Sequence, residues 1–204
     1  MMERIKKTDH VYNQAYEVIR SMIIKGEIPP GQNLVEEKLA SSLGVSRTPI
    51  RESLRRLQQE GLIQGKRVVQ PTKEDMKDIY EVRMLVEGHA AKHAAVEMSD
   101  SQRLLLIDCI SQSRNGLPEE IMKANTLFHD TIMQASHNNY MLNIISQMKS
   151  LILLFRHQVG ARPCLCEEHE KIYESIMMKD GEAAEHHMRL HLQHNLDFLL
   201  SKQP

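Results

Sequence analysis

Residues 36–61 hold two short amphipathic patterns separated by a single glycine, and this stretch constrains the fold most. Apolar side chains recur at helical spacing in both patterns: Leu39, Ala40 and Leu43 in the first, and Ile50, Leu54 and Leu57 in the second. Gly44 breaks the first helix, and Ser46 is expected to cap the second by accepting a hydrogen bond from an early backbone N–H. Pro49 is tolerated in the first turn of that helix. Two short helices joined by a glycine-containing turn predict a helix-turn-helix.

The outer face of the second predicted helix is cationic and carries hydroxyl groups near its start. Its polar positions are Ser46, Arg47, Thr48, Arg51 and Arg55. Arginines neutralise DNA phosphates, and the N–H groups at a helix start can bind one more phosphate. Solvated arginines on an ordinary helix pair would give the same pattern, so the spacing alone leaves both interpretations open.

The run LASSLGVSRTPIRESLRRLQQEGLI closely resembles the DNA-reading segment of the GntR family of bacterial transcription regulators. The resemblance implies that operator DNA is a partner and that its principal contacts are Ser46, Arg47, Thr48 and Arg51. Arginine is suited to a bidentate contact with guanine O6 and N7. The chain departs from the family at Glu37, where many members have an arginine and where a carboxylate would repel phosphate.

The flanking segments predict that this helix-turn-helix is winged. A helical stripe over residues 11–23 precedes it, and residues 62–64 and 67–70 form a tiny predicted β-hairpin after it. In a winged helix-turn-helix such a hairpin lays its tip along the DNA backbone, so we expect Lys66 and Arg67 to contact phosphate. A solvated turn is the alternative.

The near-neutral net charge hides an asymmetry between two halves. Residues 1–70 carry 12 Lys and Arg against 8 Asp and Glu, whereas residues 71–204 carry 14 against 19. A positive excess favours association with nucleic acid, so DNA binding is assigned to the first half. Pro71 marks the expected boundary between a DNA-binding domain (1–70) and an effector-binding and dimerisation domain (71–204).

The second half predicts an all-helical bundle, so the fold class is mainly α. Thr72–Asp75 is a capping-box pattern that opens a long helix. The buried face of this helix is expected to carry Ile79, Val82, Val86, Ala90, Ala94 and Met98. Further helices are expected over residues 100–114, 118–136, 139–158, 164–178 and 181–200.

Composition indicates a cytoplasmic protein with no membrane partner. No apolar run approaches the roughly 20 residues that span a bilayer, and the charged N-terminus lacks the apolar segment of a secretory signal. The chain has three cysteines, which make no disulfide framework, and this is consistent with a reducing compartment.

A subset of the histidines in the second half has the spacing that metal binding requires. Asn125 and His129 are four residues apart and share a helix face, while His169 and His191 lie on two later predicted helices. Facing helices of a bundle can bring such groups together, and imidazoles with one oxygen ligand suit Zn, Ni, Cu or Fe. Histidines are more often exposed or satisfied polar residues, so spacing alone leaves this interpretation open.

The segments NTLFHDTIMQASHNNYML and EEHEKIYESIMMKDGEAAEHHMRLH resemble the FCD domain, the effector-binding helical domain of the FadR subfamily of GntR regulators. In its metal-binding members, three histidines and an aspartate four residues before the first of them hold a divalent ion. The matching positions are Asn125, His129, His169 and His191. Asn125 departs from the aspartate and offers an oxygen without charge, which should weaken binding and disfavour hard ions. The resemblance thus implies a divalent metal cofactor, with Zn or Ni favoured.

The same resemblance implies a small organic acid as effector. Arg83 matches an arginine that often lines the FCD cavity, and a guanidinium can pair bidentately with a carboxylate. A surface ion pair with Glu87, four residues later, is the alternative. Cys164 and Cys166 lie just before His169 and could add thiolate ligands, but their spacing is weak evidence and favours two structural cysteines.

These features predict a two-domain transcription regulator. We expect a homodimer, because one short recognition helix reads too few bases for strong specificity. A metal-dependent enzyme that uses the histidine cluster and an adaptor with a vestigial pocket are the alternatives from other classes. The operator, the effector and the choice between repression and activation stay open.

Overall fold

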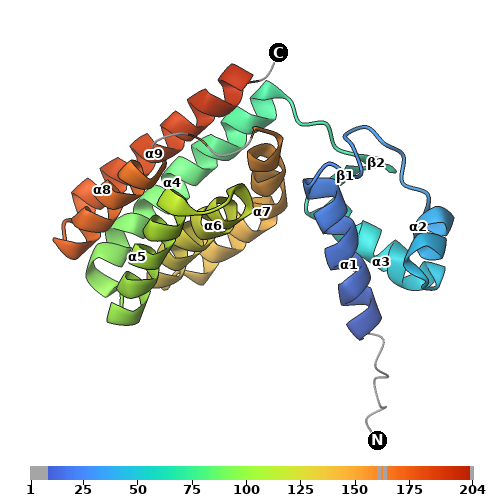
Figure 1. The fold of residues 1–204 in the computed structure, drawn as a ribbon, viewed down its shortest axis with the longest axis horizontal. Coiled ribbons are helices and arrows are strands. Elements are labelled where there is room, and N and C mark those ends of the chain that lie inside the picture. Colours follow the sequence, from blue (N-terminus) through green and yellow to red (C-terminus); the bar gives the residue numbers. More distant parts are fainter. Residues whose placement is uncertain (1–8, 160–161, 163–164, 203–204) are drawn as a thin grey trace, which may run out of the picture. The chain divides into compact units, whose positions relative to one another are not determined.

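The computed structural model describes residues 9–159, 162 and 165–202, and their regular elements are helices apart from one small hairpin (Figure 1). The predicted fold class is therefore confirmed. The chain divides into two compact units. One holds the residues up to Pro71 together with Gln147–Gln158, and the other holds Thr72–Ser146 and the residues from Val159 onward.

The first unit is a winged helix-turn-helix. Its elements are α1 (Asp9–Ile24), α2 (Glu36–Leu43), α3 (Arg47–Gln59), β1 (Ile63–Gln64) and β2 (Arg67–Val68). The two strands are antiparallel, and Gln64 pairs with Arg67 across a two-residue turn. Gly65 in this turn has a φ of 63°, a conformation that favours glycine. An apolar cluster holds the unit together, and its fully buried members are Ile19, Ile23, Ile50, Leu57 and Leu62.

The start of α3 differs from the sequence prediction in one detail. Gly44 ends α2 in the left-handed conformation, as expected, and Ser46 occupies the N-cap position with extended backbone. The Ser46 side chain, however, makes no capping hydrogen bond, so the predicted cap is wrong. Ser46 is exposed, and water can serve the first N–H groups of α3 in place of its hydroxyl.

The second unit is a helical bundle. Its helices are α4 (Lys73–Glu97), α5 (Asp100–Asn115), α6 (Pro118–Ala135), α7 (Asn139–Val159, which continues into the first unit), α8 (Leu165–Met177) and α9 (Gly181–Lys202). The predicted capping box opens α4: Asp75 N–H donates to Thr72 Oγ1 (3.1 Å), and Thr72 N–H donates to Asp75 Oδ2 (2.7 Å). Within the described residues, no helix has the length and apolar character needed to cross a membrane.

The helices α4 and α9 lie side by side along the second unit (Figure 1). Gly181 makes their close approach possible at the start of α9. A Cβ at this position would lie 2.9 Å from the backbone oxygen of Lys92, so any larger residue would push the two helices apart.

The buried face of α4 departs from the predicted stripe in the first half of the helix, whereas the predicted Ala90, Ala94 and Met98 are buried. The expected core residues Ile79, Val82 and Val86 are only half-buried. The residues that are buried in this part of the helix are Met76, Tyr80, Arg83 and Glu87. The prediction failed because it treated charged residues as surface residues, whereas here two opposite charges neutralise each other inside the bundle.

Candidate functional site

The exposed face of α3 and the hairpin present the cations predicted to contact DNA. The exposed residues are Ser46, Arg47, Thr48, Arg51, Arg55, Lys66 and Arg67. A groove of about 450 Å³ lies between the start of α2, α3 and the hairpin, and its lining includes Arg47, Arg51, Arg55 and Lys66. The fold therefore gathers these four cations, from two separate elements, on one surface.

Three contacts engage the predicted DNA-contacting arginines within the first unit. Glu36, at the start of α2, lies 3.9 Å from both Arg47 Nη2 and Arg51 Nε. Arg67 Nη1 donates to the Gly31 carbonyl at 2.9 Å and so helps to fix the preceding loop. Sequence reasoning missed Glu36, because the turn between α2 and α3 decides which acid meets the recognition helix. These exposed ion pairs are weak, so phosphates can replace the carboxylate at little cost.

In the second unit, three histidines from three helices meet in the core. His129 comes from α6, His169 from α8 and His191 from α9, and one ring nitrogen of each lies within 4.8 Å of the others. All three side chains are buried. The Phe128 ring stacks on His169, with centroids 3.9 Å apart and planes 8° from parallel. The aromatic contact fixes the plane of one imidazole before any ligand binds.

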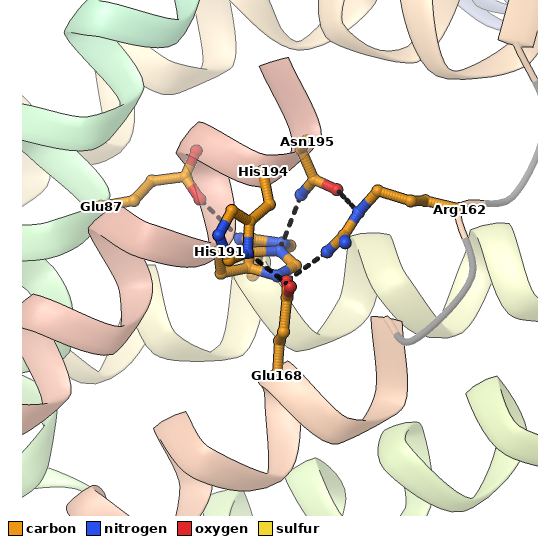
Figure 2. Close-up of polar contacts among 7 residues, drawn as sticks. Glu87, Arg162, Glu168, His191, His194 and Asn195 are labelled. Atoms are coloured by element: carbon orange, nitrogen blue, oxygen red, sulfur yellow. Dashed lines mark hydrogen bonds and ion pairs between the residues drawn. The ribbon is translucent and has the colours of Figure 1, made fainter. Parts of the chain in front are cut away.

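Two carboxylates set the tautomers of two of these histidines (Figure 2). Glu87 Oε2 lies 2.6 Å from His129 Nδ1, and Glu168 Oε2 lies 2.9 Å from His191 Nδ1. An ionised carboxylate can only accept a hydrogen bond, so each Nδ1 carries a proton, and in a neutral ring the lone pair then lies on Nε2. The two Nε2 atoms lie 3.2 Å apart. Two nitrogens bound to one ion at about 2.1 Å stand roughly 3.0–3.4 Å apart, so this separation fits a shared divalent ion.

The contacts between Glu168 of α8 and its neighbours determine the charges of Glu168 and of His191 on α9. Partial burial opposes ionisation of this carboxyl, but hydrogen bonds from His191, Arg162 and His194 lower its pKa to about 2. Burial lowers the pKa of His191 to about 3, because the interior disfavours an imidazolium. At neutral pH, Glu168 is therefore an anion and His191 a neutral potential ligand.

Arg83 lies in the core of the bundle, where its side chain is 1% exposed and that of Glu87 2%. Its Nε donates to Glu87 Oε1 at 2.6 Å and its Nη2 to Glu87 Oε2 at 3.3 Å. Burial favours the neutral acid, but the attraction of Arg83 and then of His129 holds the pKa of Glu87 far below its usual range. The ion pair that the sequence suggested for the surface is thus formed in the interior. Arg83 Nη1 is buried and donates to no acceptor in the described part of the chain.

Asn125 lies one turn before His129 on α6 and is 8% exposed. Its Oδ1 is buried and accepts no hydrogen bond from the described residues, so this oxygen is available to a ligand. Cys166 is a free, half-buried cysteine outside the histidine cluster. Cys164 lies outside the described residues.

Sequence reasoning missed a polar chain that ends on His191. Arg162 Nε donates to Asn195 Oδ1 at 2.8 Å, and Asn195 Nδ2 donates to His191 Nε2 at 2.9 Å. Arg162 also pairs with Glu168. Asn195 could have been suspected because it lies one helical turn after His191, but no local signal connects Arg162 to this site.

The winged fold with its cationic recognition helix defines the first unit as a DNA-binding module, and the bundle beside it in sequence is a candidate ligand-binding module. Comparisons with known families give the same division. The model of bacterial regulatory proteins of the gntR family matches residues 11–69, and the FCD domain model matches residues 78–194. The chain therefore belongs to the GntR family of transcription regulators and carries a C-terminal FCD domain.

Individual relatives align with this chain along nearly their whole length. An uncharacterized HTH-type transcriptional regulator of Bacillus subtilis, YdhC, is 30% identical over 96% of this chain and 94% of its own. The regulator LutR of the same organism is 30% identical over 87% of this chain and 96% of its own. The solved structure of Escherichia coli McbR/YncC superposes with a TM-score of 0.78 at 22% identity, over 94% of this chain and 98% of its own, and so supports the fold. The family and these relatives identify a transcription regulator rather than a metal-dependent enzyme.

Proposed function

We propose that the protein is a cytoplasmic, homodimeric regulator whose operator binding responds to a divalent metal ion and a small carboxylate held in the FCD domain. In this proposal residues 1–70 form the DNA-binding domain, and residues 71–204 form the effector-binding and dimerisation domain. Two recognition helices in a dimer would read a two-fold operator, since one alone contacts few bases.

The DNA contacts divide between base edges and phosphates. Arg47 and Arg51 lie at the start of the exposed recognition helix and are assigned to base edges, with Ser46, Thr48 and Arg55 beside them. Lys66 and Arg67 lie in the hairpin and are assigned to phosphate. The shared groove supports a common DNA-contacting surface, because arginines of α3 and Lys66 of the wing line it together.

The metal ligands proposed are His129, His169, His191 and the Asn125 oxygen. One observation carries this assignment: both Nδ1 atoms are hydrogen-bonded to carboxylates, and the two Nε2 atoms lie 3.2 Å apart, a separation that fits two nitrogens bound to one divalent ion. Three imidazoles and an amide favour Zn or Ni over harder ions such as Mg.

The charge balance of the site supports an anionic effector. Glu87 shares its charge with Arg83, and Glu168 shares its charge with Arg162, so neither carboxylate is available to balance a divalent ion fully. A bound ion would supply a positive centre for a carboxylate oxygen, and the buried Nη1 of Arg83 offers a second donor. Effector binding would then shift the population of arrangements of the two DNA-binding domains in the dimer.

Calorimetric titration of metal-free protein with Zn²⁺ and Ni²⁺, together with native mass spectrometry, tests the assignment. We expect one ion per chain, and alanine at position 129, 169 or 191 should remove most of the binding. His157→Ala is the matched control on α7 and should bind like the parent. If all four variants bind alike, the ligand set is wrong. A panel of small carboxylic acids, added to operator-binding assays with and without metal, then tests the effector.

A further inference from the structure

Asn195 donates a hydrogen bond to the His191 nitrogen that would coordinate the proposed metal ion. Its Nδ2 lies 2.9 Å from His191 Nε2 (Figure 2). The same His191 nitrogen lies 3.2 Å from His129 Nε2. Because Glu168 holds the proton on Nδ1 of His191, Nε2 must be the acceptor and the amide the donor. A nitrogen has one lone pair in the ring plane, so it cannot accept from Asn195 and coordinate an ion at once.

Arg162 decides which end of the Asn195 amide faces the histidine. The guanidinium has only donors, and its Nε donates to Asn195 Oδ1 at 2.8 Å. The oxygen of Asn195 therefore points toward Arg162 and its NH₂ group toward His191. Asn125 shows the opposite case, since its Oδ1 is buried and accepts no hydrogen bond within the described residues. Of these two buried amides, Asn125 is suited to act as a ligand and Asn195 is suited to compete with one.

We propose that Asn195, oriented by Arg162, is an internal competitor that lowers the metal affinity of the histidine cluster and makes metal uptake release Arg162 from its amide partner. The inference rests on the metal site proposed above. Asn195 must give up His191 Nε2 before that nitrogen can coordinate, and the amide then turns or withdraws. Either movement alters its bond to Arg162, so occupancy of the site changes the contacts of Arg162.

The first test compares metal affinities. Removing the competitor with Asn195→Ala should tighten Zn²⁺ binding by roughly 2- to 12-fold, the equivalent of one neutral hydrogen bond. Gln193→Ala is the control. It removes a side-chain amide from the same helix, and this amide donates to the exposed Asp197 rather than to the histidine cluster. Calorimetric titration with Zn²⁺ and Ni²⁺ gives both affinities, and thermal melting of the metal-free proteins checks that each variant folds.

The second test is a double-mutant cycle with Arg162→Leu. Without the guanidinium, Asn195 can turn its oxygen toward the site and change from competitor to ligand, so Zn²⁺ affinity should rise. Arg162→Leu also removes the ion-pair partner of Glu168, and this contributes to the rise in Zn²⁺ affinity. That contribution should persist in the Asn195→Ala background. The part carried by the amide should disappear in the Asn195→Ala background.

The possible results distinguish the competitor role of Asn195 from the existence of the metal site. Tighter binding by Asn195→Ala and a non-additive cycle support the competitor role. Weaker or equal binding by Asn195→Ala overturns it while leaving the three-histidine site in place, because Asn195 would then be a ligand or a bystander. A parent protein that takes up neither Zn²⁺ nor Ni²⁺ overturns the metal site itself, and the competitor role with it.

Discussion

Replacing Arg83 with methionine tests whether the interior of the FCD domain depends on its buried ion pair. Methionine keeps the length and apolar stem of the side chain but removes the charge that compensates Glu87. Exposed fractions of 1% and 2% mean that water does not screen this pair. Breaking one partner of a buried pair typically destabilises a protein by about 3–5 kcal/mol, because the other charge is left uncompensated. For a chain of this size that corresponds to a melting temperature lower by roughly 6–20 °C.

A double variant separates the lost attraction from the buried charge. In Arg83→Met/Glu87→Gln no charge remains unpaired, so the loss should be much smaller than in Arg83→Met alone. Lys77→Met is the matched control, since it breaks an exposed pair with Glu74 on the same helix and should change stability little. Circular dichroism gives the melting temperatures, and hydrogen exchange of α4 and α6 locates the change. A loss below about 1 kcal/mol for Arg83→Met would show that Glu87 is solvated or protonated, and the reasoning would fail.

Three further perturbations follow from the same structure. On an operator selected from random DNA, Arg51→Ala should lose about 1–3 kcal/mol and relax base preference, whereas Lys66→Ala should weaken all sequences alike and flatten the salt dependence; equal losses of specificity would refute the division. Asn125→Asp should tighten Zn²⁺ binding and shrink the benefit of an added carboxylic acid, as measured by calorimetry; unchanged affinity would place Asn125 outside the ligand set. Burial and the bond to Glu60 raise the pKa of Tyr16, so the unfolded chain loses this proton first and stability should fall as pH rises above about 10. Tyr16→Phe should flatten that alkaline decline in melting temperature, and an unchanged decline would assign it to other groups.

Short-range patterns in the sequence predicted most of the architecture. The glycine turn at Gly44, the capping box at Thr72 and the apolar spacing of α3 depend on residues within a few positions of one another. Such local signals determine where helices begin and end, because caps and turns use nearby backbone groups. The same local reasoning failed at Ser46, whose hydroxyl does not cap α3.

The chemistry of the histidine cluster could be predicted only in part. Spacing and family resemblance singled out His129, His169 and His191, but neither indicated which nitrogen of each ring carries the proton. That property depends on Glu87 and Glu168, which reach the rings from other helices. No periodicity within one helix encodes a partner 42 residues away.

Tertiary structure alone decided where the charges lie. In sequence, Arg83 and Glu87 are an ordinary pair on a helix surface, and the apolar stripe of α4 was predicted beside them. The bundle instead buries both, because each neutralises the other and Glu87 also accepts from His129. Likewise, Asn195 is one more polar residue of α9 until Arg162 turns its amide toward His191. The sequence by itself determined the DNA-binding fold and the three imidazoles, whereas the protonation, orientation and charge balance around them arise from contacts between helices far apart in the chain.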